Sequence, residues 1–278
     1  MHKCIFSHDH INQMIHPHTY IHPHAKLATN VKVDPFSVIH SNVEIGEGTW
    51  IGSNVTIMDG ARIGSNCRIF PGAVISAIPQ DLKYGGEDTT VEIGDNTTIR
   101  EFVTINRGSK ATWTTKVGSN CLIMAYCHIA HDCVVGNHCI MSNNTQLAGH
   151  VELGDYSILG GMCAVHQFVK VGQHVIISGG SLIRKDVPPF IKAGHEPISY
   201  AGVNSVGLKR RGFSLDSINE ILNIYRIIYN KGLNTTQALN YIEEEIPATN
   251  ERDEIVTFIR DSGRGIIKRR LKGSNFED

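Results

Sequence analysis

The chain has 278 residues, 41% of them hydrophobic, and a formal net charge of −1 at pH 7. This balance supplies no basic field for a phosphate backbone, so nucleic acid is excluded as a partner. Residues 1–14 lack the apolar core of a signal peptide, and no stretch approaches the ~18 apolar residues that cross a bilayer. We therefore expect a cytoplasmic protein without membrane insertion.

Histidines crowd the start of the chain, around the near-duplicate hexads that begin at Ile15 and Ile21. Their spacing leaves two interpretations open. The histidines either face solvent on the first coils or bind a metal ion. Solvated positions are the commoner case, and we expect residues 1–14 to be an N-terminal extension.

A six-residue period dominates the chain from Ile15 to Ile183. Of the 29 positions in this series, 26 hold Ile, Leu, Val or Met, against about 12 expected by chance. A triangular coil with one short strand per side turns one branched residue inward on each side, which explains a period of six. The pattern predicts a parallel β-helix of about ten coils over residues 15–188.

Small or β-branched residues occupy the position four after each branched one, where they suit a second inward site near a corner. Six of the seven cysteines fall here, and no CxxC pair occurs, so we expect buried reduced thiols rather than a zinc site. These cysteines are Cys67, Cys121, Cys127, Cys133, Cys139 and Cys163.

Three positions break the period, namely Asp81, Glu87 and Ala111. They lie in two segments, near 79–90 and 107–116, which we expect to leave the coil as loops. Loops on a rigid scaffold commonly carry function, so charged residues in them are candidates for a site.

Residues 18 apart should stack at the ~4.8 Å strand spacing, because three hexads make one coil. Gly149 should then lie beside His131, with Gln167 one coil further, and His150 should lie over Asp132. His166 lies close to the same patch. An imidazole base next to a backbone N–H is suited to acyl transfer, although a structural role for these histidines is the alternative.

A covalent mechanism has no support in the sequence, because no Gly-x-Ser-x-Gly elbow occurs and the cysteines point inward. We therefore expect direct transfer.

After residue 188 the six-residue period stops, and apolar residues from Leu215 to Tyr229 recur at helical spacing. Ser214 is the expected N-cap of this helix, and Gly232 its end. Residues 189–278 should form a small α-helical domain. Its two basic clusters, 209–211 and 268–270, are either solvated faces or sites for an acidic carrier or a diphosphate.

The hexads resemble those of the hexapeptide-repeat acyltransferases, whose β-helices wind left-handed. Handedness rests on this resemblance alone, because parallel crossovers are otherwise right-handed. The expected fold is therefore an all-β left-handed parallel β-helix followed by α-helices.

Local segments more closely resemble the UDP-N-acetylglucosamine 3-O-acyltransferase family. They are residues 80–84, 127–133, 147–150, 164–168 and 202–213. The resemblance implies transfer of a 3-hydroxyacyl chain from acyl carrier protein to UDP-N-acetylglucosamine, the first step of lipid A synthesis. It also implies a homotrimer and requires no cofactor or metal.

Residue roles follow from the same resemblance. His131 matches the general base and Gly149 the oxyanion donor, and Asp132 is a candidate to orient the base. Gly179 matches the residue that ends the acyl groove, and glycine there favours long donors. The remaining matches or candidates for substrate binding are Asp81, Lys83, His128, Asn143, His150, His166, Gln167, Asn204, Arg210 and Arg211. Val206 stands where some members have glutamate, which leaves the nucleotide contacts open.

Three other functions fit this sequence less well. The sister enzyme that N-acylates UDP-3-O-acylglucosamine carries a uridine-binding domain before its hexads, for which a start at Ile15 leaves no room. A γ-type carbonic anhydrase needs two histidines five apart, and none are. A purely structural repeat does not explain the loops. A 3-amino UDP-sugar as acceptor stays open, because it would meet the same histidine.

Overall fold

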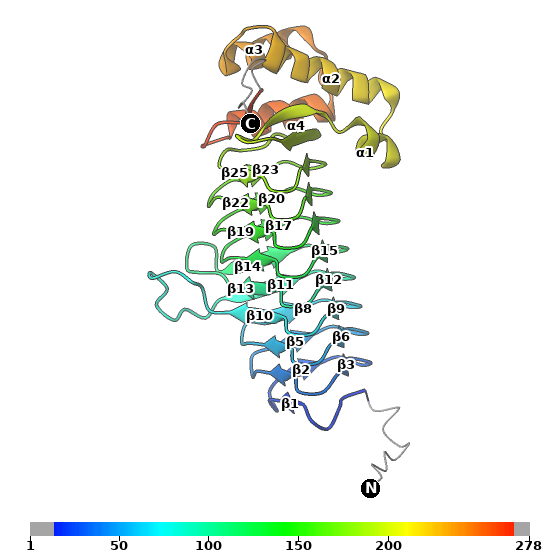
Figure 1. Ribbon diagram of the computed structural model, residues 1–278, viewed down its shortest axis with the longest axis vertical. Helices are drawn as coiled ribbons and strands as arrows, with labels where there is room; N and C mark the ends of the chain where they lie inside the picture. Colours follow the sequence, from blue (N-terminus) through cyan, green and yellow to red (C-terminus); the bar gives the residue numbers. More distant parts are fainter. Residues whose placement is uncertain (1–13, 270–278) are drawn as a thin grey trace, which may run out of the picture.

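The six-residue period folds into a three-sided column of short parallel strands, described here for residues 14–269 in a computed structural model (Figure 1). Each strand pairs with the one that lies one coil further along the chain. Val134 pairs with Glu152 and His128 with Gln146, both 18 residues apart as predicted. The three faces of the column are three sheets, which we name A, B and C in the order in which a coil visits them.

The strands of each sheet within residues 14–269 are as follows. Sheet A has eleven strands: β3 (Lys32–Val33), β6 (Trp50–Ile51), β9 (Arg68–Ile69), β12 (Thr98–Ile99), β15 (Leu122–Ile123), β18 (Ile140–Met141), β21 (Ile158–Leu159), β24 (Ile176–Ile177), β26 (Ile191–Gly194), β27 (Ser199–Val203) and β28 (Lys268–Arg269). Sheet B has nine: β1 (Tyr20–Ile21), β4 (Val38–Ile39), β7 (Thr56–Ile57), β10 (Val74–Ala77), β13 (Thr104–Asn106), β16 (His128–Ile129), β19 (Gln146–Leu147), β22 (Ala164–Val165) and β25 (Leu182–Ile183). Sheet C has eight: β2 (Lys26–Leu27), β5 (Glu44–Ile45), β8 (Ala61–Ile63), β11 (Thr90–Ile93), β14 (Thr114–Val117), β17 (Val134–Val135), β20 (Glu152–Leu153) and β23 (Lys170–Val171).

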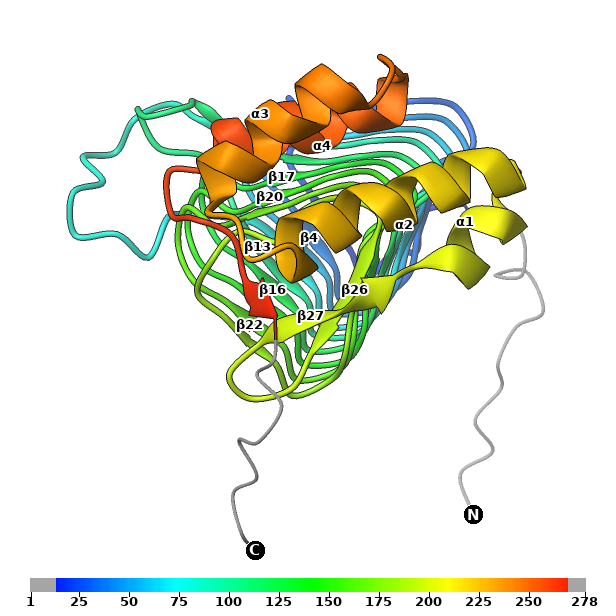
Figure 2. The ribbon, with the colours of Figure 1, turned by 90° about the horizontal axis from the view of Figure 1, so that it is seen from above.

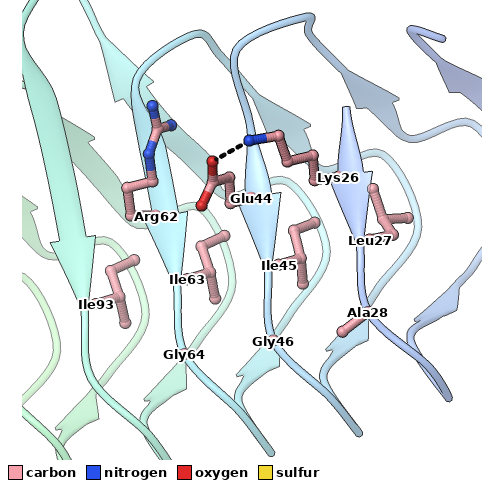
Figure 3. Close-up of a pocket in the computed structure, with 10 residues that line it drawn as sticks. All are labelled: Lys26, Leu27, Ala28, Glu44, Ile45, Gly46, Arg62, Ile63, Gly64 and Ile93. Carbon is pink, nitrogen blue, oxygen red and sulfur yellow. Dashed lines mark hydrogen bonds and ion pairs between the residues drawn. The ribbon is translucent and has the colours of Figure 1, made fainter. Parts of the chain in front are cut away.

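The core of the column is the stack of inward branched residues. Ile39, Ile57 and Ile129 are fully buried. Around a shallow pocket on sheet C, Figure 3 shows Leu27, Ile45, Ile63 and Ile93 in one such row. The outward row beside it is charged, and Lys26 pairs with Glu44 at 2.9 Å. The branched residue thus fills the interior while its neighbour faces water.

All six repeat cysteines are buried free thiols, as expected. Burial raises the pKa of Cys133 to about 12, which keeps this thiol protonated and unreactive.

Each coil has three corners, named AB, BC and CA after the sheets that they join. One residue at most corners has a positive φ, and in many coils it is Asn, which tolerates the left-handed conformation. Asn54, Asn66 and Asn120 are examples, with φ of 58°, 55° and 58°. In the upper coils the BC corner uses Asp132, His150 and Phe168 instead.

Two loops interrupt the column, residues 78–89 between β10 and β11 and residues 107–113 between β13 and β14. They contain Asp81, Glu87 and Ala111, the three positions that broke the period. Both leave at the BC corner and project to the same side of the column (Figures 1 and 2). These positions add no strand, and sheet B has nine strands within residues 14–269. Parallel bridges at Ile15 and Val187 extend the column beyond its regular strands, in line with the predicted length of about ten coils.

The C-terminal part caps the end of the column (Figure 1). Its helices are α1 (Ser205–Arg210), α2 (Leu215–Asn230), α3 (Thr235–Glu245) and α4 (Asn250–Arg260). Ser214 is the N-cap of α2, and Gly232 follows its C-cap with a φ of 72°, as the sequence predicted. No helix within residues 14–269 has the length and apolar content needed to span a bilayer.

The sequence did not predict that this region also contains strands. β26 continues sheet A in parallel with β24, and β27 returns antiparallel to it. The hairpin covers the open edge of the last coil, whose backbone N–H and C=O groups would otherwise lack partners. Its pattern was missed because the six-residue period ends where the hairpin begins.

Candidate active site

The BC corner of the middle coils brings the predicted histidine patch together. His131 and Asp132 follow β16, and Gly149 and His150 occupy the same corner one coil further. The His150 N–H donates to the His131 carbonyl at 3.1 Å, which fixes the two turns against each other. The stacking arithmetic from the sequence therefore placed these residues correctly.

His131 and Asp132 contact each other through their side chains. The His131 Nδ1 lies 2.7 Å from the Asp132 Oδ2. Neighbouring residues make this contact because Asp132 has a φ of 60°, which turns its side chain back toward the preceding residue. The Asp132 N–H also donates to Thr115 Oγ1 at 2.8 Å, which holds the turn in place.

The Asp132 carboxylate is buried, with 3% of the residue exposed. Burial opposes its ionisation, but hydrogen bonds from Thr112, His131 and Ser109 outweigh burial and hold its pKa well below the usual range. An ionised carboxylate can only accept hydrogen bonds. The His131 Nδ1 must therefore carry the proton, and Nε2 is left with a free lone pair that can act as a base.

Gly149 lies against this Nε2. A Cβ on Gly149 would lie 2.8 Å from both the Nε2 and the Cε1 of His131, so no larger residue fits without moving the ring. Its carbonyl accepts from the Phe168 N–H at 3.1 Å. Among the hydrogen bonds of residues 14–269, none uses the Gly149 N–H as donor.

His150 closes the patch from the next coil. Its ring meets that of His131 edge-on, with centroids 5.2 Å apart, and stacks on Phe168 at 4.4 Å. Burial lowers the pKa of His150, and the fields of Asp132 and Asp81 partly oppose this effect.

The donor atoms of His131, Asp132 and His150 lie within 4.8 Å of one another, a spacing that could hold a metal ion. Asp132 already accepts from Ser109, Thr112 and His131, and His131 Nδ1 is engaged. These contacts favour an orienting carboxylate over a metal ligand.

Other predicted residues surround this patch at varied distances. Lys83 is exposed in the first loop, where its N–H donates to Asp81 Oδ1 at 3.0 Å. His128 faces outward on sheet B, where its Nδ1 bonds Thr104 Oγ1 at 2.7 Å. His166 and Gln167 are exposed at the BC corner one coil above Gly149.

Two groups of predicted residues lie at other corners. Asn143 and Gly179 are on the AB corner, across sheet B from His131. Arg211 lies at the CA corner, with its guanidinium 5.2 Å from the centre of the Tyr156 ring. One chain therefore does not bring all of the candidates together.

The Asn204 side chain makes hydrogen bonds within the protein. Its amide donates to the His174 carbonyl at 2.9 Å, and its oxygen caps α1 by accepting from Gly207 at 3.2 Å. With 2% of the residue exposed, its side chain is buried, and both of its polar atoms hold the fold in this conformation. Arg210 is exposed beside it.

Sequence reasoning missed Ser109 and Thr112, which bond Asp132 from the second loop. A signal was present, because this loop leaves the same corner as Asp132, and residues 107–116 include one Ser and three Thr. The contact itself depends on how the loop folds back.

Comparison with known proteins decides the family. Residues 186–267 match the family model described as UDP N-acetylglucosamine O-acyltransferase, domain 2. Residues 42–77 and 114–149 match the bacterial transferase hexapeptide, six repeats. The acyl-[acyl-carrier-protein]–UDP-N-acetylglucosamine O-acyltransferase of Thiobacillus denitrificans is 44% identical over 91% of this chain and 99% of its own length. The chain belongs to this O-acyltransferase family.

Further relatives agree with this assignment. The O-acyltransferase of Xanthomonas oryzae is 48% identical over 92% of this chain and 98% of its own. The solved UDP-N-acetylglucosamine acyltransferase of Bacteroides fragilis is 52% identical, with a TM-score of 0.89 over 92% of this chain and all of its own. That of Francisella novicida is 39% identical, with a TM-score of 0.88 over 95% of this chain and all of its own. The predicted family and its left-handed parallel β-helix are confirmed.

Proposed function

We propose that this chain transfers an (R)-3-hydroxyacyl group from acyl carrier protein to the 3-hydroxyl of UDP-N-acetylglucosamine, the first step of lipid A synthesis, in the cytoplasm. The observation that carries the proposal is the His131–Asp132 pair, whose free Nε2 faces the Gly149 backbone. Relatives that carry this activity in their names share 44–48% of their residues with the chain.

The reaction would proceed by direct attack. His131 Nε2 takes the proton of the sugar 3-hydroxyl while that oxygen attacks the thioester carbonyl carbon. The Gly149 N–H donates to the oxyanion that develops on the carbonyl oxygen. When the tetrahedral species collapses, the C–S bond breaks, and the His131 imidazolium returns its proton to the carrier thiolate. Asp132 would hold the imidazole in the required tautomer throughout.

Substrate contacts would come from the residues around this pair. We assign the sugar and the donor to Asp81 and Lys83, and the walls of the cleft to His128, Asn143, His150, His166 and Gln167. Two arginines could bind the diphosphate: Arg210 is exposed, and Arg211 lies over the Tyr156 ring with an Nη1 that has no hydrogen-bond partner within residues 14–269. Asn204 is engaged in the fold.

The proposal includes a homotrimer. The AB, BC and CA corners of one chain lie apart, so a cleft that uses all of the candidates needs a neighbouring copy. Four apolar side chains also form an outward row on sheet A, stacked in register through β15, β18, β21 and β24. They are Leu122, Ile140, Ile158 and Ile176. Burial of this row against a second copy would stabilise the assembly.

Mass spectrometry of the product tests the proposal. The chain is incubated with 3-hydroxyacyl carrier protein and either UDP-N-acetylglucosamine or its 3-amino analogue, with and without a chelator. We expect an O-linked acyl product from the first sugar in both conditions. If a product forms only from the 3-amino sugar, that sugar is the acceptor instead of UDP-N-acetylglucosamine. If only UDP-3-O-acylglucosamine is acylated, the chain has the sister activity. Sedimentation of the active enzyme as a monomer would contradict the trimer.

A further inference from the structure

The second loop, residues 107–113, exists as an insertion directly below the candidate base. Thr104 of β13 pairs with His128 of β16, an offset of 24 residues where an uninterrupted coil gives 18. The six additional residues leave the column between β13 and β14, at the BC corner and in the coil that precedes Asp132. Without the insertion, this coil would have only a short BC corner, with no loop side chains next to Asp132.

The loop uses this position to surround the Asp132 carboxylate. The Ser109 N–H donates to Asp132 Oδ1 at 2.9 Å, and the Ser109 hydroxyl donates to Oδ2 at 2.7 Å. Thr112 Oγ1 donates to Oδ1 as well. Together with His131 Nδ1 these groups give the carboxylate four hydrogen-bond partners, so its lone pairs are saturated.

The loop is itself fixed at both ends. At the neck, the Gly108 N–H donates to the Thr90 carbonyl at 3.1 Å, and the Arg107 N–H donates to the Ala77 carbonyl at 2.9 Å. Within the loop, the Trp113 N–H donates to the Ser109 carbonyl at 2.7 Å, and the Ala111 N–H donates to the Ser109 hydroxyl at 3.2 Å. Other residues of the loop therefore hold both the carbonyl and the hydroxyl of Ser109 in place, in addition to its bonds with Asp132.

We propose that Ser109 and Thr112 are positioning residues for the acyltransfer reaction, which act on the base through Asp132. A side chain as deeply buried as Asp132 has no water to solvate its charge, and the loop hydroxyls replace that solvation. They also fix the plane of the carboxylate, which in turn fixes the His131 ring against Gly149. The inference rests on the proposed function, in which His131 is the base, but assigns a role to residues that touch neither substrate nor reacting atoms.

Steady-state kinetics of loop variants test the inference. Ser109→Ala and Thr112→Val each remove one hydroxyl donor and keep the size of the side chain nearly constant. We expect each to lower kcat on the order of 10-fold, and the double variant on the order of 100-fold, with KM for the nucleotide sugar unchanged, because a small misplacement of the base costs this much. Ser109→Thr and Thr112→Ser keep the hydroxyl and should recover most of kcat.

Thr90→Val is the matched control. Its hydroxyl pairs with that of Thr114 at 2.9 Å at the neck of the same loop, without reaching Asp132. This variant should keep the wild-type kcat. If Thr90→Val lowers kcat as much as Thr112→Val does, the loop has only a structural role and the inference is wrong.

A double-mutant cycle separates action through Asp132 from general loosening. In an Asp132→Asn background, Ser109→Ala and Thr112→Val should cause no further loss of kcat, because the group through which they act is gone. Losses that multiply instead would overturn the inference. Full activity of both loop variants alongside an inactive His131→Ala would overturn it too and leave the proposed function intact. An active His131→Ala would instead overturn the proposed base.

Discussion

The BC and CA corners of the same coils use one backbone turn for two different purposes. At both corners a residue with positive φ recurs in each coil, namely Asp132, His150 and Phe168 at the BC corner and His138, Tyr156 and His174 at the CA corner. At the BC corner Asp132 accepts from two loop hydroxyls and from His131, whose Nε2 is left free, while His150 stacks on Phe168. At the CA corner they form a stacked column of rings, with centroids 4.5 Å and 4.8 Å apart.

The two corners differ in the segments that cover them. The C-terminal part covers the top of the CA column, where Phe213 lies 5.1 Å from the His174 ring. His174 is 6% exposed there and has no hydrogen-bond partner for Nδ1 within residues 14–269. The BC corner has instead the two loops, and the second of them holds Asp132. At the hexad position that His138 and His174 occupy at the CA corner, the BC corner has Asp132, which the second loop holds beside the proposed base His131.

The largest expected effect is on the base. His131→Ala should lower kcat by about 10²–10⁴-fold, the usual contribution of a general base, with little change in unfolding temperature. His138→Ala is the matched control from the exposed part of the CA column and should keep full activity. If His131→Ala keeps more than about a tenth of the wild-type kcat, His131 is not the base, and the BC corner does not differ from the CA corner in catalysis.

Gly149→Ala sharpens the same contrast without removing a functional group. Its Cβ would overlap the edge of the His131 ring, and the ring must shift away from its place beside the oxyanion donor. We expect kcat to fall by on the order of 100-fold, since displacements near 1 Å have this cost. Stopped-flow or steady-state rates at saturating substrate measure it, and a kcat close to that of the wild type would mean that this contact does not position the base.

We propose a third use for the AB corner, in which Gly179 marks the end of an acyl groove. With glycine at 179, a donor four carbons longer could gain up to ~3 kcal/mol, or about a hundredfold, at ~0.8 kcal/mol per CH₂. Gly179→Met should abolish this preference in a comparison of carrier proteins loaded with different chain lengths.

Gly179→Ala is the control for Gly179→Met, because any Cβ here lies 2.9 Å from the Gly161 carbonyl oxygen and both variants share that strain. An unchanged chain-length profile in Gly179→Met would place the end of the groove elsewhere.

The remaining prediction concerns stability, and not activity, at the CA corner. Burial, and then Arg211, lower the pKa of His174 to about 4, below the ~6.5 of an unfolded histidine. Between these values the unfolded state binds a proton that the folded state does not, so the free energy of unfolding falls as pH drops from ~6.5 to ~4, by up to about 3 kcal/mol.

Urea unfolding at pH 7 and pH 5 measures this loss of stability. His174→Phe should lose less stability than wild type over that interval, whereas His138→Phe should match wild type. Equal losses in wild type and His174→Phe would contradict the assignment.

Much of the site was accessible from the sequence because the repeat converts separation into position. The prediction that Gly149 lies beside His131 needed only the offset of 18, and Ser214 and Gly232 marked α2 through local capping chemistry. The offset fails where the chain leaves the column. Ser109 and Thr112 lie in such a segment, so their contact with Asp132 depends on how the loop folds back and not on a count of residues.

The sequence by itself determined the three-sided column, its inward residues and the corner that carries His131, because each follows from a six-residue period that every coil repeats. Only the tertiary structure decided which side chains meet. It turned Asp132 onto His131, folded the second loop over the carboxylate, and committed Asn204 to capping α1 at another corner. These contacts depend on side-chain direction and on segments outside the repeat, and a period along the chain specifies neither.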